Sequence, residues 1–322
     1  MLPDNSPQHN SPQRHPAVQA AAVAQRDSRM DGWLTASAAK AGRYCDDIYF
    51  LESWNQACES LPDPGPILRA NTYVLLKPET LAAGRVEQVL TLIQDRGYLL
   101  LDVLPILLDR HRIRALWQYQ LNAAPLATLA TVDLIMSCGP AAIALLTEAP
   151  GAQQSGGSAS ERLSVMKGLS YGPRRPTDIR ALLGGTTRLF SYLHVPDEPA
   201  DLVRELGIWF DHPARRRVYR TLAGGDGTPK LAIRQAARRL EPDVVIDLDL
   251  HRALDTVARA IGAGDEARLR QVRTCLLEEC EATTLLDLVH WLSGLPGVPA
   301  WDRAIIAAHL VQREPLARPP LL

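Results

Sequence analysis

The segment from residue 72 to residue 210 alternates between strand-like and helix-like patterns, and this alternation restricts the fold more than any other feature. Short β-branched and apolar runs favour strands, whereas apolar residues at 3.6-residue spacing favour helices. The strand candidates are Thr72–Leu76, Tyr98–Leu107, Ala141–Thr147 and Leu189–Leu193, and the helix candidates are Val86–Ile93, Ile113–Leu121, Leu129–Met136 and Pro199–Trp209. This βαββαβ order with additions predicts an α+β fold, with a mainly antiparallel sheet and helices on one face.

The regions on either side of this segment have a different character. Residues 1–30 are rich in Pro, Gln, Ser and Asn, which predicts a disordered tail, and residues 31–70 predict an N-terminal helical extension. We assign residues 71–220 to the central domain, with a flexible insertion at Gln153–Ser160 and a linker at roughly 221–230. Residues 231–322 predict a small all-α domain, because helical periodicity recurs in Leu231–Leu240, Val244–Ile261, Ala267–Cys280, Thr284–Leu292 and Trp301–Val311.

The composition is that of a globular protein, since 46% of the 322 residues are hydrophobic. The net charge of −1 gives no whole-chain reason to bind nucleic acid or an anionic membrane, and no apolar run reaches membrane-spanning length. The five cysteines are odd in number and form no CxxC pair, which argues against a disulfide framework or a zinc knuckle. We therefore expect a cytoplasmic protein in a reducing environment.

His194 stands at the end of an apolar run and is followed by a short acidic turn and an amphipathic helix. Glu205 lies on that helix, and Lys77 directly precedes Pro78 at the end of an earlier strand candidate. A carboxylate that orients the ring, together with nearby cationic side chains, makes an imidazole that can accept phosphate. Such a histidine needs little else, because phosphoryl transfer depends mainly on positioning and positive charge.

Five motifs follow one another between residues 73 and 210. They are Tyr73–Thr80 (YVLLKPET), Ser137–Ala142 (SCGPAA), Pro176–Arg180 (PTDIR), His194 with Asp197 and Glu205, and Gly207–Phe210 (GIWF). In this order and spacing they resemble the motifs of nucleoside diphosphate kinases, over about residues 71–212. The resemblance implies a ferredoxin-like βαββαβ domain of the nucleoside diphosphate kinase type.

The resemblance also implies a role for each matching residue. Lys77 would contact the transferred phosphate and the sugar, and Arg180 would pair with phosphates. His194 would take the γ-phosphate and pass it to a second nucleotide, while Glu205 would bond the other ring nitrogen. Mg²⁺ would bridge the phosphates of the donor, and no metal site formed by the protein alone is expected. The family's hexamers and tetramers imply a homo-oligomer, although the added segments could block those contacts.

The phosphate-binding positions depart from the family pattern. The family's arginine falls near Ser164, where Arg162 is close enough to substitute for it. The threonine that holds a phosphate falls at Leu169 or Ser170, and the asparagine before the histidine is Ser191. Arg162, Ser170 and Ser191 are therefore the expected phosphate-binding residues besides Arg180.

The nucleoside-binding positions depart further. The Gly-Ser after the histidine is replaced by Val195-Pro196, and the catalytic tyrosine matches Gln120 or, with a shift, Tyr119. The aromatic residue that stacks on the base falls in Ala127–Leu129, where there is none. We expect the residues for phosphoryl transfer to be retained and the residues that bind the nucleoside to differ from those of the family.

Each of these residues also has a purely structural interpretation. His194 could be a buried histidine bonded to a backbone carbonyl, Lys77 the polar end of a strand, and Tyr119 part of the core. Asp197 and Glu198 could only cap the following helix.

Two further charged groups lie outside these motifs. Asp247, Asp249 and His251 would share one face of a strand as a metal site, but they diverge on a helix, which the periodicity favours. The arginines at positions 215, 216, 217 and 220 form a basic cluster that is either a solvated face or a site for an anion or a partner.

Three functions are consistent with these features. The preferred one is a phosphotransferase that works through phospho-His194 on a nucleotide or related acceptor. The second is a catalytically degenerate kinase-like module, a nucleotide-sensing or protein-interaction scaffold whose C-terminal helical domain binds another protein. The third is a dedicated kinase for a small phosphate-accepting metabolite. None of the three calls for a membrane or a nucleic acid as partner.

Overall fold

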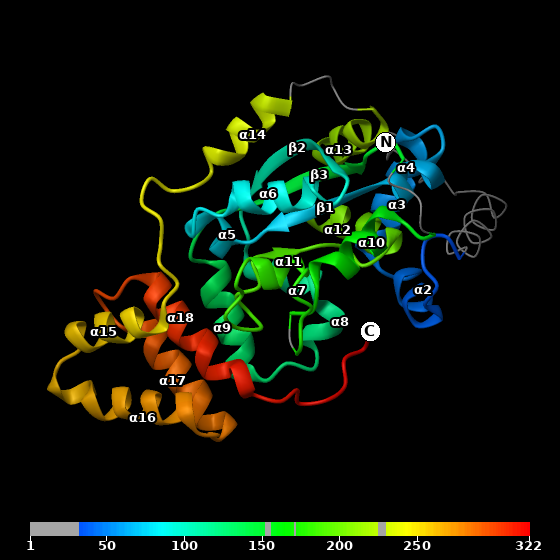
Figure 1. Cartoon of the computed structure of the whole chain (residues 1–322). Helices are drawn as coiled ribbons and strands as arrows, with labels where there is room; N and C mark the ends of the chain where they lie inside the picture. Colours follow the sequence, from blue (N-terminus) through cyan, green and yellow to red (C-terminus); the bar gives the residue numbers. More distant parts are fainter. Residues whose placement is uncertain (1–31, 152–155, 171, 225–229) are drawn as a thin grey trace, which may run out of the picture.

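The computed structural model of the chain describes residues 32–151, 156–170, 172–224 and 230–322. Its centre is a four-stranded sheet of β1 (Asn71–Leu76), β2 (Tyr98–Ile106), β3 (Ala141–Glu148) and β4 (Leu193–His194). The strands are ordered β2-β3-β1-β4, and every neighbouring pair is antiparallel (Figure 1). This order, with helices between the strands, confirms the predicted ferredoxin-like α+β fold.

Strand β4 is much shorter than the predicted strand Leu189–Leu193. Only Leu193 and His194 pair with β1, opposite Leu76 and Leu75 respectively. The preceding residue, Tyr192, has a φ angle of 63°, and no other non-glycine residue in the described part of the chain has a positive φ. This left-handed residue ends the extended conformation, so the pairing with β1 cannot continue toward residue 189.

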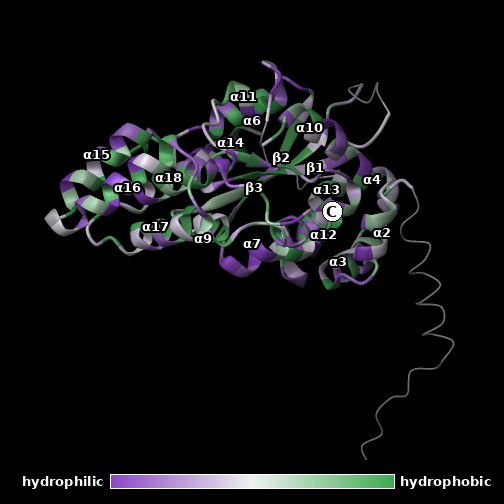
Figure 2. Ribbon diagram, turned by 90° about the horizontal axis from the view of Figure 1, so that it is seen from below, coloured by the Kyte–Doolittle hydropathy of each residue, from purple (hydrophilic) through white to green (hydrophobic). Residues whose placement is uncertain are grey.

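Helices cover both faces of the sheet, which corrects the prediction of one covered face. Alternate residues of β1 enter two separate cores, with Tyr73 and Leu75 in the first and Val74 and Leu76 in the second. The first core is completed by α3 (Ile48–Ser60), α4 (Pro64–Ala70), α12 (Pro199–Trp209) and α13 (His212–Gly224). The second contains α5 (Pro78–Ala82), α6 (Val86–Gln94), α10 (Ala159–Lys167), α11 (Ile179–Leu182) and α14 (Lys230–Arg238). Figure 2 shows this layering, with α6, α10 and α11 on one side of the strands and α3, α12 and α13 on the other.

Helix α10 begins inside the segment that was predicted to be a flexible insertion. Ser158 and Glu161 form a reciprocal capping box, which starts the helix at Ala159. The prediction is therefore wrong for Ala159 and Ser160, while residues 153–155 lie outside the described residues. The predicted disordered tail at 1–30 and the linker residues 225–229 also lie outside them.

The helices after β2 and those near the C-terminus extend the first core. They are α7 (Arg110–Leu116), α8 (Gln118–Leu121), α9 (Leu126–Met136), α15 (Leu250–Ala260), η2 (Ala263–Asp265), α16 (Glu266–Leu277), α17 (Ala282–Gly294), α18 (Ala300–Leu310) and η3 (Val311–Arg313). Helices α17 and α18 pack against α9, and α15 packs against α18 (Figure 1). Helix α14, which was predicted to belong to the C-terminal all-α domain, lies instead on the sheet against β2 and α6.

The predicted helix Val244–Ile261 is wrong in its first turn and a half. Asp249 accepts a hydrogen bond from the N–H of Arg252 and caps α15, so the helix starts only at Leu250. Asp247 and Asp249 therefore precede the helix on which His251 lies. Within the described residues, no group of three His, Cys, Asp or Glu side chains is arranged to hold a metal ion.

Cys275 and Cys280 form a disulfide, which contradicts the argument from cysteine count and spacing. Helix α16 ends at Leu277, and the chain then turns so that the two Cα atoms lie 5.5 Å apart. An odd count does not exclude one local pair, and the expected reducing environment loses its main support. In the described part of the chain, no helix is both long enough and apolar enough to cross a membrane.

Helix α12 makes an unusually close contact with α3 at Gly207. A Cβ atom at this position would lie 2.2 Å from the carbonyl oxygen of Tyr49. We expect Gly207→Ala to destabilise the protein by about 1–3 kcal/mol through this clash, although helix propensity alone would favour alanine by about 1 kcal/mol. Urea denaturation measures the change.

Gly42→Ala is the matched control for that substitution, because Gly42 lies within helix α2 (Ala38–Tyr44) and has no neighbouring atom within 4 Å of a built Cβ. It should leave stability unchanged or raise it slightly. Equal stability of the two variants would show that α3 and α12 tolerate separation.

Candidate active site

His194 is presented to the site by a tightly held turn. The carbonyl oxygen of Tyr192 accepts hydrogen bonds from the N–H of Lys77, at 3.0 Å, and from the hydroxyl of Thr80. The N–H of Tyr192 donates to a carboxylate oxygen of Glu79 at 3.1 Å. A strained backbone conformation persists where its neighbours fix it. The histidine is therefore anchored directly to the β1–α5 junction that carries Lys77.

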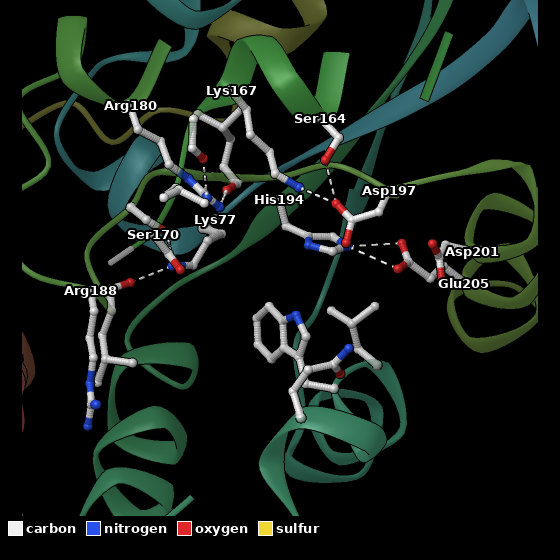
Figure 3. A pocket seen from close by; sticks show the side chains of 18 of the residues that line it. Lys77, Ser164, Lys167, Ser170, Arg180, Arg188, His194, Asp197, Asp201 and Glu205 are labelled. Carbon is white, nitrogen blue, oxygen red and sulfur yellow. Dashed lines mark hydrogen bonds and ion pairs between the residues drawn. The ribbon is translucent and has the colours of Figure 1, made fainter. Parts of the chain in front are cut away.

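One nitrogen of the His194 ring is bound and the other is open. Nε2 lies 3.1 Å and 3.0 Å from the two carboxylate oxygens of Glu205. Glu205 also accepts a hydrogen bond from the hydroxyl of Tyr73, which in turn accepts one from Nε1 of Trp209 at 2.8 Å. Because a carboxylate accepts, the neutral ring carries its proton on Nε2. Nδ1 bonds to no group in the described residues and lies on the side of the ring away from Glu205 (Figure 3).

The Lys77 ammonium is buried in the wall of the same pocket. Nζ lies 2.7 Å from Glu79, donates to the carbonyl oxygen of Leu189 at 2.5 Å and lies 3.4 Å from the hydroxyl of Ser191. Burial lowers the pKa of Lys77, and the Glu79 carboxylate opposes that effect. Lys77 and Ser191, two predicted site residues, are thus brought together beside His194.

Arg180 provides a second buried cation that lines the pocket. Its two terminal nitrogens donate to the carbonyl oxygens of Gly168, at 2.8 Å, and Leu193, at 2.7 Å. Burial and the nearby Arg174 guanidinium lower the pKa of Arg180 to about 10, so the side chain stays charged at neutral pH. Its Nε has no partner in the described residues. Buried donors are normally satisfied, so an unpaired one at a pocket wall is suited to an anionic ligand.

Ser164, Lys167 and Asp197 form a cluster that the motif comparison did not reveal. The hydroxyl of Ser164 and Nζ of Lys167, the latter at 2.9 Å, both bind Oδ1 of Asp197, and Lys167 also donates to the carbonyl oxygen of Val195 (Figure 3). Partial enclosure by the pocket wall acts to raise the pKa of Asp197, but Lys167 and Ser164 lower it well below its ordinary value. The sequence did contain one indication of it: Ser164 and Lys167 are three residues apart, and residues at this spacing share one face of a helix.

The polar groups face a pocket of about 850 Å³, which Ser170 also lines. The opposite wall is apolar and comes from α7–α9; it contains Leu116, Trp117, Leu121, Val132, Ile135 and Met136. Trp117 meets the His194 ring edge-on, with ring centroids 5.8 Å apart. A pocket with cations on one side and apolar surface on the other suits a ligand that joins a phosphate to a larger organic group.

The C-terminal segment is attached to the helices that form the apolar wall. The hydroxyl of Thr128 on α9 donates to the carboxylate of Glu314 at 2.7 Å. Arg188, which lines the pocket, donates to the carbonyl oxygen of Glu314 at 2.9 Å and to the hydroxyl of Thr128 at 2.7 Å. Farther on, the N–H of Ala317 donates to the carbonyl oxygen of Ala123 at 2.8 Å. Thr128 lies in Ala127–Leu129, the positions at which the resemblance predicted the base-stacking residue.

Arg162 and Tyr119 do not line this pocket. The Arg162 guanidinium pairs with Glu148, because residues two apart on α10 point in different directions and Ser164 takes the pocket side. The hydroxyl of Tyr119 donates to Asp47 at 3.1 Å in the core, which matches its structural interpretation. Gln120, the alternative alignment, lines the pocket.

The donor set at the pocket fits a magnesium ion that arrives with phosphates. Asp197 is about two-thirds exposed, and its Oδ2 binds no other group in the described residues. Mg²⁺ commonly takes one or two carboxylates, several waters and substrate phosphates, rather than a cage made by the protein alone. One open carboxylate beside a cationic pocket meets that requirement.

Comparison with known proteins gives structural neighbours only. No family model and no curated protein matches the sequence. The structure is similar to an NDP kinase from Pyrobaculum aerophilum, with 14% identity, a TM-score of 0.35, and coverage of 44% of this chain and 96% of that chain. It is similar to the nucleoside diphosphate kinase from Encephalitozoon cuniculi, with 13% identity, a TM-score of 0.37, and coverage of 44% and 88%. It is also similar to a nucleoside diphosphate kinase family protein from Babesia bovis, with 18% identity, a TM-score of 0.36, and coverage of 45% of this chain and 90% of that chain. A likeness at this level carries no argument about activity.

Proposed function

We propose that the chain is a phosphotransferase of the nucleoside diphosphate kinase type, which moves the γ-phosphate of a nucleoside triphosphate through His194 to a nucleotide or related acceptor. The observation that carries the proposal is the state of the His194 ring. Glu205 holds Nε2, and Nδ1 is open to a pocket lined by Lys77, Lys167 and Arg180. A neutral imidazole with its lone pair turned toward cations is suited to attack phosphorus.

The reaction has two steps. In the first, the Nδ1 lone pair attacks the γ-phosphorus, a P–N bond forms, and the bond from phosphorus to the bridging oxygen breaks, so that the nucleoside diphosphate leaves. In the second, an acceptor oxygen attacks the same phosphorus, the P–N bond breaks and returns its electron pair to Nδ1, and the acceptor's proton is lost to solvent. Glu205 stabilises the positive charge on the phosphorylated ring, while the cations stabilise charge on the phosphoryl oxygens.

Magnesium would enter with the donor nucleotide. Oδ2 of Asp197 is the protein oxygen that would face it, while Ser164 and Lys167 hold Oδ1. When bound, the ion would neutralise charge on the donor phosphates. The attachment of the C-terminal segment at Thr128 supports an altered nucleoside preference, because the family's stacking position is engaged in an internal contact.

Labelling with γ-³²P-ATP and Mg²⁺ tests the proposal. The native protein should acquire an acid-labile, base-stable label that a nucleoside diphosphate removes. His194→Gln should lose the label, whereas His251→Gln, at an exposed position on α15, should keep it. Absence of label in the native protein, or label that survives in His194→Gln, would contradict the proposal.

A non-catalytic, nucleotide-sensing role is the second candidate. It is favoured by the internal pairing of the pocket cations, since Lys77 pairs with Glu79 and Lys167 with Asp197. A ligand that binds only the folded state must raise its stability. Thermal stabilisation by nucleotides with Mg²⁺, in the absence of a phosphohistidine label, would favour this role.

A further inference from the structure

Helix α2 of the N-terminal extension forms part of the wall of the pocket. Lys40 and Tyr44, both on α2, line the pocket together with Asp201 of α12. Their polar atoms converge on that carboxylate: the hydroxyl of Tyr44 donates to Oδ1 at 2.6 Å, and Nζ of Lys40 lies 2.7 Å from Oδ2. Asp201 is 6% exposed, so these two donors replace the water that would otherwise solvate it.

Asp201 lies one helical turn before Glu205. Residues four apart project from the same face of a helix, so two buried carboxylates stand side by side behind the His194 ring (Figure 3). Burial and the neighbouring Glu205 carboxylate together raise the pKa of Asp201 to about 6, although the Lys40 ammonium acts in the opposite direction. Two like charges at this spacing repel, and the cation that offsets the repulsion comes from α2.

We infer that Lys40, Tyr44 and Asp201 are positioning residues. They place a second negative charge behind Glu205 and so set the electrostatic potential at the His194 imidazole. The consequence for rate rests on the proposed function, whereas the electrostatic coupling does not. Phosphorylation makes the ring positive, so a nearby carboxylate favours the phosphorylated form over the free one. The motifs of the central domain contain neither Lys40 nor Tyr44, so the two donors that hold this charge come from the extension.

The titratable groups around Asp201 determine which charges near it change with pH. Lys40 and Tyr44 on α2, Glu205 on α12 and Tyr73 on β1 interact with Asp201 directly. Glu198, which precedes α12, shares the lysine; Arg204 lies beside Tyr44, and His194 lies beyond Glu205. Burial acts to lower the pKa of Lys40, but Asp201 and Glu198 raise it, and burial and Asp201 raise the pKa of Tyr44. Both donors therefore keep their protons at neutral pH. The charge of Asp201 is present above about pH 6 and is lost below it.

The test is a histidine titration of the full chain by NMR, with the His194 signals assigned from His194→Gln. Removing the Asp201 charge should make the imidazole less basic, so Asp201→Asn should lower the pKa of His194 by about 0.3–1 unit. Tyr44→Phe, which removes only a hydroxyl, should shift it in the same direction by less, because Asp201 then holds its proton to higher pH.

Glu198→Gln is the matched control. Glu198 lies 2.6 Å from the same lysine, but it does not line the pocket and lies two turns from Glu205. It should shift the His194 titration by less than about 0.2 units, even if α2 docks less firmly. Equal shifts in Asp201→Asn and Glu198→Gln, or none in Asp201→Asn with the fold intact, would overturn the inference and leave α2 a structural role only.

The two hypotheses fail separately. The titration needs no phosphoryl transfer, so a His194 shift without radioactive label would refute the proposed function and keep the coupling. Label on His194 without a shift would do the reverse. Where both hold, the pH profile of labelling should move with the shift in Asp201→Asn and stay unchanged in Glu198→Gln.

Discussion

Replacing Glu205 with glutamine should slow phosphorylation of His194 by about 10²- to 10⁴-fold. The amide can donate a hydrogen to Nε2, which stabilises the tautomer that carries its proton on Nδ1. The lone pair needed for attack is then absent from the side of the ring that faces the pocket. The amide also carries no charge to balance the phosphorylated ring. Rapid-quench labelling with γ-³²P-ATP under single-turnover conditions gives the rate.

The change should leave nucleotide binding nearly intact, since Lys77 and Arg180 bind no atom of Glu205. Thermal shift with nucleotide measures that directly. Tyr73→Phe, which removes one hydrogen bond to Glu205, should have a much smaller effect on rate. A native labelling rate in Glu205→Gln would mean that the ring is oriented by something other than this carboxylate.

Replacing Glu79 with leucine should cost about 3–5 kcal/mol of unfolding free energy, because it leaves the buried Lys77 ammonium without its counter-ion. Nζ of Lys77 lies 2.7 Å from Glu79, and the two side chains are 4% and 0% exposed. The N–H of Tyr192 also loses its acceptor. Denaturation in urea at neutral pH measures the loss.

The double replacement of Lys77 by methionine and Glu79 by leucine provides the control. Removing both charges avoids the unpaired ion, so it should recover most of the lost stability. It should still abolish labelling of His194, because the Lys77 cation that would stabilise the phosphoryl oxygens is absent. Equal destabilisation by the single and double changes would show that the Tyr192 hydrogen bond, rather than the ion pair, supplies the stability.

The parts of the fold that could be predicted are those written in local sequence. Helix α12 begins and ends where its periodicity and Pro199 indicate, and β1 and β3 follow from their apolar runs. The pairing of His194 with Glu205 follows from the short turn between strand and helix, which brings the helix back alongside the strand. The domain boundaries are predictions that no comparison tests.

What could not be predicted depends on contacts between distant segments. Arg162 and Lys167 lie on different faces of α10. For that reason Lys167 lines the pocket, whereas Arg162 pairs with Glu148. Tyr119 lies in the core, where its hydroxyl donates a hydrogen bond to Asp47, a residue far earlier in the chain. The second covered face of the sheet likewise depends on how distant segments fold together. The disulfide between Cys275 and Cys280 is a local pair instead, and it was missed because neither the cysteine count nor the search for CxxC detects such a turn. Local periodicity contains none of this information.

The attachment of residues near the C-terminus to α8 and α9 has a practical consequence for dissecting the chain. A fragment ending near residue 220 would contain all five motifs and the reactive histidine. It would lack Glu314 and Ala317, which bind Thr128 and Ala123 beside the apolar wall. If such a minimal fragment is inactive, the cause would be the loss of these contacts to the apolar wall of the pocket. The result would not count against the chemistry of the intact chain.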